Sequence, residues 1–284
     1  MSLEITPEMI KKLREQTGVG IGKCKEALQE ANGDIDKAIT YLRKAGVATA
    51  AKKEGRATNE GMIGVAENEQ AIAILEANAE TDFVVKNDRF QEFIRNVTQD
   101  AAAANPQTLD DFLNQQYSQD PSLTIDEYRA TIVQSIGENI QIRRLQTFAK
   151  DNSDVSFGVY SHFGGKIVVV VEIRGSAAEE QLAKDIAMHV AATAPEYVKP
   201  EDVPESVLES EKDIVRSQVK GKPDSIREKI VEGKLSKFFD HACLNCQLYI
   251  KNDSMTIAEL VDNRTKEIGK PLTLAAFVRW TVGG

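Results

Sequence analysis

The sequence has few cysteines, no long apolar run and no excess of positive charge. Three cysteines in 284 residues are too few for a disulfide framework, which favours a reducing compartment. No apolar stretch approaches the roughly 18–20 residues that cross a bilayer, and the first residues lack the basic start and apolar stretch of a signal peptide. Lysine and arginine number 35 against 44 acidic residues, a net charge of -9, which disfavours nucleic-acid binding because its affinity comes mostly from neutralised phosphates. We therefore expect a cytoplasmic protein that binds no membrane and no nucleic acid directly.

Local motifs of enzyme active sites are also scarce. No nucleophile stands beside a plausible base. The glycine-rich segment 17–22 follows a helical pattern instead of a strand and lacks the Gly-Lys-Ser/Thr ending of a phosphate-binding loop. His241, Cys243 and Cys246 have the spacing of metal ligands, but a structural zinc site needs a fourth ligand. We expect no catalytic residue, no cofactor and no metal, although carboxylates brought together only by folding keep an enzyme as an alternative.

Residues 1–46 are predicted to form three short helices. Thr6, followed by proline, is typical of the start of the first helix. Asp34 is predicted to cap the third helix and Gly46 to end it. Residues 47–58 are rich in alanine and lysine and are predicted to be a linker.

A hairpin followed by an apolar helix is then predicted twice, which indicates a duplicated α+β core. The first half covers residues 59–150 and the second half residues 151–284. Within the first half, a capping box of Thr124 and Glu127 is predicted to start one long helix that continues as far as Arg144.

Residues 204–242 carry apolar residues at roughly seven-residue spacing on two segments joined by Gly-Lys-Pro. This pattern is typical of an antiparallel helical hairpin. We expect it to be inserted into the second half of the core.

Residues Thr81, Asp82, Phe83 and Val84 lie in the connection between a predicted strand and a predicted helix. A Thr-Asp pair at such a connection commonly turns the chain and caps the next helix. That role does not account for Phe83, whose apolar ring is unneeded in a polar connection unless it packs inward or contacts a partner. We take this connection as the candidate working site.

Two signatures of the elongation factor Ts family resemble stretches of this chain. Residues 78–84 (Asn-Ala-Glu-Thr-Asp-Phe-Val) are similar to the central motif of the family. Residues 13–28, with Leu13-Arg14, Thr17-Gly18-x-Gly20 and Cys24-Lys25-x-Ala27-Leu28, are similar to its N-terminal signature. Further similar stretches at 136–144, 186–192 and 231–234 follow in the order of the family. The resemblance covers nearly the whole chain.

The resemblance implies an N-terminal ubiquitin-associated-like module and a guanine-nucleotide exchange factor without bond-making chemistry. The partner would be elongation factor Tu·GDP, and the chain would release GDP by displacing Mg²⁺ and disturbing the phosphate site. By the family pattern, the motif Thr81–Val84 inserts Phe83 between helices of the GTPase domain, while Asp82 fixes the tip by hydrogen bonds.

Other partner contacts are implied in both parts of the chain. The module around Arg14, Val19, Gly20 and Ile21 is expected to bind the same GTPase domain. His162, at the tip of the second hairpin, is expected to hold other domains of elongation factor Tu.

Simpler interpretations remain open beside the resemblance. His162 fits an ordinary turn, whereas His189 and Cys24 lie on apolar faces and fit core positions. A general adaptor or chaperone built on the N-terminal module is a further alternative. Such a protein would bind regardless of guanine nucleotide, whereas an exchange factor binds more tightly when the nucleotide site is empty.

Overall fold

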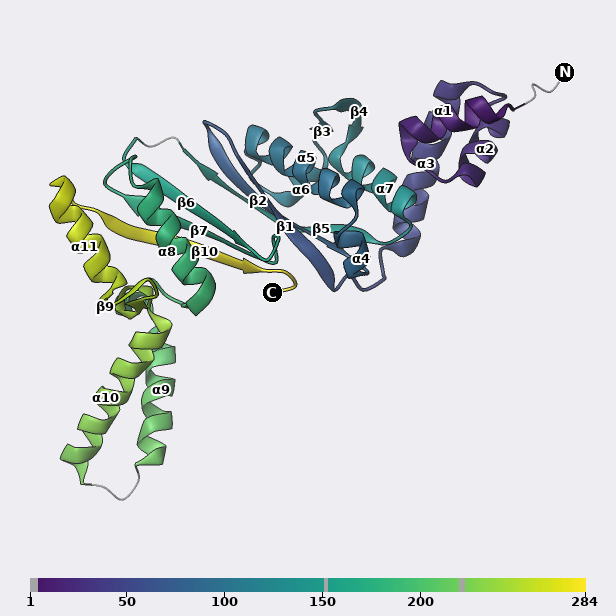
Figure 1. The fold of residues 1–284 in the computed structure, drawn as a ribbon. Coiled ribbons are helices and arrows are strands. Elements are labelled where there is room, and N and C mark those ends of the chain that lie inside the picture. Colours follow the sequence, from purple (N-terminus) through teal and green to yellow (C-terminus); the bar gives the residue numbers. More distant parts are fainter. Residues whose placement is uncertain (1–4, 151–152, 220–222) are drawn as a thin grey trace. The chain divides into compact units, whose positions relative to one another are not determined.

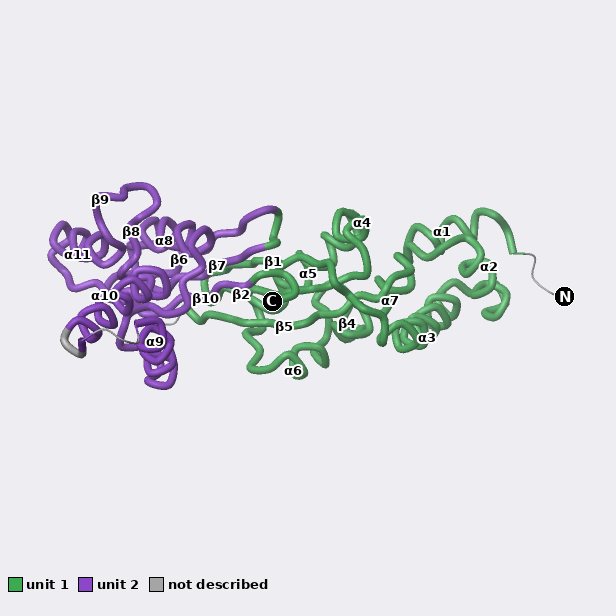
Figure 2. Tube along the Cα trace, turned by 90° about the horizontal axis from the view of Figure 1, so that it is seen from below, with its two compact units in different colours: residues 1–151, 164–166, 281–284 green, residues 152–163, 167–280 purple. Residues whose placement is uncertain are grey.

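The computed structural model describes residues 5–150, 153–219 and 223–284. The chain forms two compact units (Figure 2). Unit 1 contains the described residues up to 150 together with 164–166 and 281–284, and unit 2 contains residues 153–163 and 167–280. No helix in these described ranges is long and apolar enough to cross a membrane.

Three helices form the N-terminal module, as the sequence predicts: α1 (Pro7–Thr17), α2 (Ile21–Glu30) and α3 (Ile35–Lys53). The hydroxyl of Thr6 accepts the backbone N–H of Met9, and the carboxylate of Asp34 accepts that of Lys37, so both predicted caps are present. Cys24 is buried in the core of this module, where burial raises the pKa of its thiol.

The third helix does not end at Gly46, so that prediction is wrong. α3 continues to Lys53, which makes residues 47–53 of the predicted linker helical. Gly46 is buried where α3 packs on a later helix of unit 1. A Cβ on Gly46 would lie 3.2 Å from the side chain of Gln134 and 3.4 Å from the carbonyl oxygen of Ala130. The glycine therefore permits close helix packing and does not end the helix.

A three-stranded antiparallel sheet forms the centre of unit 1, in the order β1-β2-β5. Its strands are β1 (Glu60–Glu67), β2 (Ala71–Ala79) and β5 (Ile140–Ala149), and β2 is buried along its whole length. The helices α5 (Asp88–Ala104) and α7 (Ile125–Ile136) lie on one side of the sheet (Figure 1). The short elements are α4 (Asp82–Val85), α6 (Leu109–Leu113), β3 (Gln116–Tyr117) and β4 (Asp120–Thr124).

The predicted long helix is shorter than expected. The capping box of Thr124 and Glu127 is present, but α7 ends at Ile136, where Gly137 adopts a left-handed φ of 91°. Ile140 and the following residues then form β5 and pair with β2. The predicted extension of the helix to Arg144 is wrong, because Ile132 and Ile136 belong to α7 whereas Ile140 and Ile142 belong to β5.

The last residues of the chain contribute to unit 1. The carboxylate of Glu76 is fully buried and forms an ion pair with Arg144, with oxygen–nitrogen distances of 2.7 Å. The backbone N–H of Gly283 donates to the same carboxylate at 2.8 Å, and Arg144 donates to the carbonyl of Thr281. A buried charge needs this set of partners because desolvation otherwise disfavours it.

Unit 2 contains the second antiparallel sheet, in the order β10-β7-β6. Its strands are β6 (Val155–His162), β7 (Ile167–Arg174) and β10 (Thr273–Thr281), and α8 (Glu180–Thr193) packs on them. The other elements are the helical hairpin α9 (Glu205–Gln218) and α10 (Asp224–Ala242), β8 (Leu248–Tyr249), β9 (Asn252–Thr256) and α11 (Ile257–Ile268). The α+β fold class is confirmed, while the domain boundaries stay predictions.

Candidate functional site

The Thr81–Val84 motif forms a single exposed turn at the end of β2. Thr81 is extended, with φ −130° and ψ 157°, and α4 begins at the next residue. Val84 and Val85 point into the core of unit 1. Phe83, on the same turn, is 80 % exposed, more than any other large apolar side chain of the described residues. An apolar ring held in water gains free energy when a partner covers it.

Two carboxylates hold the start of this turn. The carboxylate of Glu138 accepts the backbone N–H of Thr81 at 3.0 Å and its hydroxyl at 2.8 Å. In the reverse direction, Glu80 accepts the backbone N–H of Asn139 at 2.6 Å and the guanidinium of Arg56 at 3.3 Å. These donors, the N–H of Asn139 first, hold the pKa of Glu80 below its usual range. Residues 80–81 and 138–139 are thus joined by reciprocal hydrogen bonds.

Asn139 connects a third segment to the same place. Its side-chain amide donates to the carbonyl of Glu54 at 3.2 Å and to that of Arg56 at 2.9 Å, and the residue is fully buried. The chain that leaves α3 is therefore tied to the base of the Phe83 turn. The sequence analysis assigned no role to Glu138 or Asn139 because it placed both inside the helix predicted to continue to Arg144; the signal that could have found them was Gly137 directly before them.

Asp82 pairs with Lys86 within the turn. The Oδ2–Nζ distance is 2.8 Å, and both side chains are exposed. The hydrogen bond from Lys86 lowers the pKa of Asp82, and Asp82 in turn raises the pKa of Lys86. The carboxylate therefore remains charged at neutral pH and accessible to hydrogen-bond donors of a partner.

The expected contact residues of the N-terminal module differ in exposure. Arg14 and Gly20 are exposed, and Ile21 is 57 % exposed at the start of α2. Val19 is only 2 % exposed and packs in the core of the module. Its side chain is therefore not accessible to a partner in this structure, unlike that of Ile21.

His162 lies at the end of β6, before the turn to β7. It is half-buried, and its Nδ1 lies 3.0 Å from the hydroxyl of Tyr160. The neighbouring Phe163 is 77 % exposed. The sequence analysis selected His162 and not its neighbour Phe163, an aromatic residue directly before Gly164 and Gly165.

The thiols of Cys243 and Cys246 do not have the character of reactive cysteines. Burial raises the pKa of Cys243 to about 11 and also raises that of Cys246, so both thiols are protonated at neutral pH. Within the described ranges, no three His, Cys, Asp or Glu side chains come together as a metal site.

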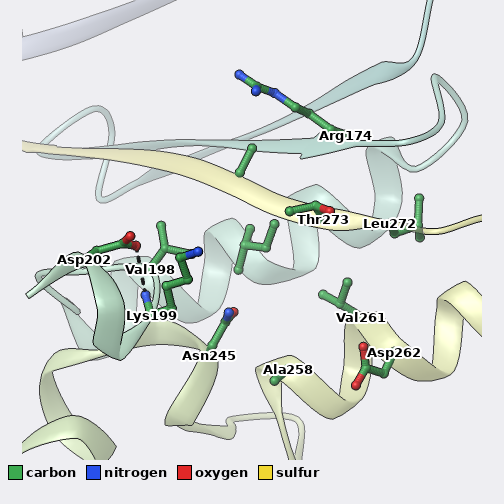
Figure 3. A pocket seen from close by; sticks show the side chains of 12 residues that line it. Arg174, Val198, Lys199, Asp202, Asn245, Ala258, Val261, Asp262, Leu272 and Thr273 are labelled. Atoms are coloured by element: carbon green, nitrogen blue, oxygen red, sulfur yellow. Dashed lines mark hydrogen bonds between the residues drawn. The ribbon is translucent and has the colours of Figure 1, made fainter.

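A cavity of about 590 Å³ lies in unit 2 beside β10 (Figure 3). Basic Arg174 and Lys199 and acidic Asp202 and Asp262 line it, together with Asn245 and apolar side chains of α11 and β10. Because its charges are balanced, the lining favours no particular ionic ligand. The cavity contains none of the residues that the sequence analysis selected.

Comparisons with known proteins give one consistent result. The family model described as "Elongation factor TS" matches residues 80–284. A protein of Protochlamydia amoebophila named "Elongation factor Ts" is 61 % identical over 279 residues, covering 98 % of this chain and 99 % of that protein. Proteins of the same name from Chlamydia muridarum and Chlamydia caviae are 44 % and 45 % identical. The match to the Chlamydia muridarum protein covers 99 % of this chain and 99 % of that protein. The match to the Chlamydia caviae protein covers 97 % of this chain and 98 % of that protein.

Proposed function

Because this chain belongs to the elongation factor Ts family, whose members are nucleotide-exchange factors of elongation factor Tu in translation elongation, we propose that it releases GDP by displacing Mg²⁺ and disturbing the phosphate site of its partner. The proposal includes a cytoplasmic location and action by binding alone, without bond-making chemistry or a cofactor. Its main support is the exposed ring of Phe83 on a turn that Glu138 and Glu80 hold in place.

The turn can act on the partner because its ring gains free energy only where it is covered. If the pocket for Phe83 opens only in a distorted GTPase, binding favours that distorted state, which holds nucleotide weakly. Reciprocal hydrogen bonds at the base of the turn fix the backbone in advance, so that less conformational entropy is lost on binding.

The magnitudes require a further contact. Burying one phenylalanine contributes about 1.5–3 kcal/mol, whereas a thousandfold weakening of nucleotide binding needs about 4 kcal/mol of coupling. We assign the additional contact to the N-terminal module, through Arg14, Gly20 and the exposed side chain of Ile21. His162 is assigned to contacts with other domains of elongation factor Tu.

Coupling of this kind is reciprocal. If the protein weakens GDP binding by a given factor, GDP weakens binding of the protein by the same factor. The complex is therefore tightest when the nucleotide site is empty and dissociates when a new nucleotide binds.

Stopped-flow release of fluorescent GDP from the cognate elongation factor Tu tests the proposal. The protein should accelerate release as its concentration rises, and it should bind nucleotide-free elongation factor Tu more tightly than the GDP complex. Equal affinity for both forms, without acceleration, would contradict exchange activity and favour the adaptor alternative.

A further inference from the structure

The turn between β6 and β7 carries a second exposed aromatic ring. Phe163 is 77 % exposed, close to the 80 % of Phe83, whereas every other exposed large apolar side chain of the described residues is below 60 %. A side chain of this size covered only by water lowers solubility and contributes little to folding. Its position needs an explanation other than core packing.

The backbone at this position is unfavourable for phenylalanine. Phe163 has a φ of 47°, in the left-handed region, and Gly164 and Gly165 follow with φ values of 63° and 85°. Positive φ suits glycine and disfavours residues with bulky side chains. Glycine would therefore serve the turn better than phenylalanine. Strain that the fold does not need indicates a functional constraint on the side chain.

Neighbouring rings hold Phe163 in one direction without covering it. The ring centroid of His162 lies 3.9 Å from that of Phe163, and the hydroxyl of Tyr160 lies 3.0 Å from Nδ1 of His162. Because the ring is already oriented, less conformational entropy is lost when a partner binds it.

The turn is attached to β1 through residues that belong to unit 1. The carbonyl of Gly165 accepts the backbone N–H of Ile63 at 2.8 Å, and Lys166 forms a 2.7 Å ion pair with Glu60. A Cβ on Gly165 would lie 2.7 Å from the carbonyl oxygen of Ile63, so only glycine allows this approach.

The same end of β1 lies close to the Phe83 turn. The pKa of Lys86 is raised by Asp82 first and, to a smaller extent, by Glu60. Glu60 pairs with Ala79 at the end of β2, directly before the Thr81–Val84 turn, and the same Glu60 forms the ion pair with Lys166. Within unit 1, residues 164–166 are thus attached to the end of β1 that lies beside the start of the exchange motif.

We propose that Phe163 is a second apolar contact with elongation factor Tu, and that its unfavourable backbone is retained because it directs the ring outward. This inference rests on the proposed function and assigns to Phe163 a share of the affinity of the complex. The matching site on the partner is an apolar pocket that accepts one aromatic ring.

Phe163→Gly tests the inference because it removes both the ring and the strain. The dissociation constant for nucleotide-free elongation factor Tu should rise by about tenfold or more. The thermal unfolding midpoint should stay unchanged or rise by up to roughly 3 °C. Glycine removes the strain of the left-handed backbone, which stabilises the fold, but it also increases the conformational entropy of the unfolded chain, which partly offsets this gain. A ring that only stabilises the fold would instead lower the midpoint and leave the affinity unchanged.

Three variants complete the experiment. Ala194, at the end of α8, has a φ of 49°, so Ala194→Gly relieves similar strain without removing a ring and should leave the dissociation constant unchanged. Leu248 is 59 % exposed, and Leu248→Ala should likewise leave binding unchanged. Phe163→Asn serves if the glycine variant is less stable, because asparagine tolerates the left-handed region.

The outcomes separate the two proposals. If the wild-type protein releases GDP and binds normally, but Phe163→Gly and Phe163→Asn bind equally well, the inference is overturned and the exchange function stands. If the wild-type protein neither binds elongation factor Tu nor releases its nucleotide, both proposals are overturned. Weaker binding of both variants, with unchanged binding of the Ala194 and Leu248 controls, supports the inference.

Discussion

Glu138 accepts two hydrogen bonds from Thr81, one from the backbone N–H at 3.0 Å and one from the hydroxyl at 2.8 Å. The two residues are 57 positions apart in the sequence. One side chain therefore fixes both the backbone and the side chain at the residue where the Thr81–Val84 motif begins. The stiffness of the motif depends on a residue outside it.

Replacing Phe83 by alanine should slow nucleotide release more than it weakens binding. The ring is 80 % exposed, so its loss should leave the thermal midpoint unchanged, while release at saturating protein should slow by about tenfold or more. Stopped-flow release of fluorescent GDP and titration of nucleotide-free elongation factor Tu measure the two effects. Ile214→Ala, at an exposed apolar position on α9, is the matched control. Unchanged release by Phe83→Ala would exclude the insertion of this ring as the driving contact.

Replacing Glu138 by alanine should loosen the turn. It removes the acceptor of a partly buried N–H and of a hydroxyl, at a cost of roughly 1–3 kcal/mol in stability, and release at saturating protein should slow more than binding weakens. Glu138→Gln should retain most of the activity, because its amide can accept from the N–H of Thr81 and donate to the hydroxyl. Release kinetics and binding titrations of both variants measure this difference, with Glu69→Ala, at an exposed turn, as control. Equal defects in the glutamine and alanine variants would contradict the positioning role.

Substitutions at Ile21 and at Val19 in the N-terminal module should have different effects, the first on binding and the second on stability. Ile21 is 57 % exposed and Val19 only 2 % exposed. Ile21→Ala should weaken binding to elongation factor Tu without changing the melting temperature. Val19→Ala should destabilise the module by about 1–3 kcal/mol, because it leaves a cavity in a small core. Thermal unfolding followed by circular dichroism and binding titrations of both variants measure these effects. Normal binding by Ile21→Ala would contradict the proposed contact of Ile21 with elongation factor Tu.

His189 should make unit 2 sensitive to mild acid. Its ring is fully buried: Nδ1 lies 3.3 Å from the backbone N of Ile250, which donates to it, and Nε2 lies 2.8 Å from Oε1 of Gln247. Burial lowers the pKa of this histidine. The unfolded chain therefore binds the proton more readily, and the stability contributed by neutral His189 is complete above about pH 6.5 and falls as pH decreases below that value.

Thermal midpoints measured between pH 8 and pH 5 check this expectation. The wild-type midpoint should fall across that range, and His189→Gln, which cannot titrate, should show a smaller fall from a lower starting value. Parallel curves for the two proteins would show that the acid sensitivity arises elsewhere.

The sequence singled out Phe83 because an apolar ring stood in a polar connection between two regular elements, and the structure decides between inward packing and exposure in favour of exposure. The helical caps at Thr6, Asp34 and Thr124 were also predictable, since capping depends on residues three positions apart. These features depend on residues close together in the sequence, so they can be predicted from it.

Other features depend on partners distant in the sequence. Glycine is common at helix ends, so the sequence predicts that the helix ends at Gly46. In the structure, Gly46 lies inside α3 at the contact with α7. The isoleucines on either side of Gly137 fit a single helical pattern until pairing with β2 draws Ile140 into a strand. The left-handed backbone of Phe163 also follows from the geometry of its turn, which residue identity alone does not specify.

The buried carboxylate of Glu76 receives one of its donors from Gly283. Arg144 and Asn78 reach this carboxylate from within residues 5–150, whereas the hydrogen bond from Gly283 forms only after that residue has been synthesised. Dividing the gene near codon 151 would give an N-terminal fragment with an incompletely satisfied charge at its centre. Unit 1 is therefore incomplete in a fragment that ends near residue 151, because residues 281–284 also belong to it.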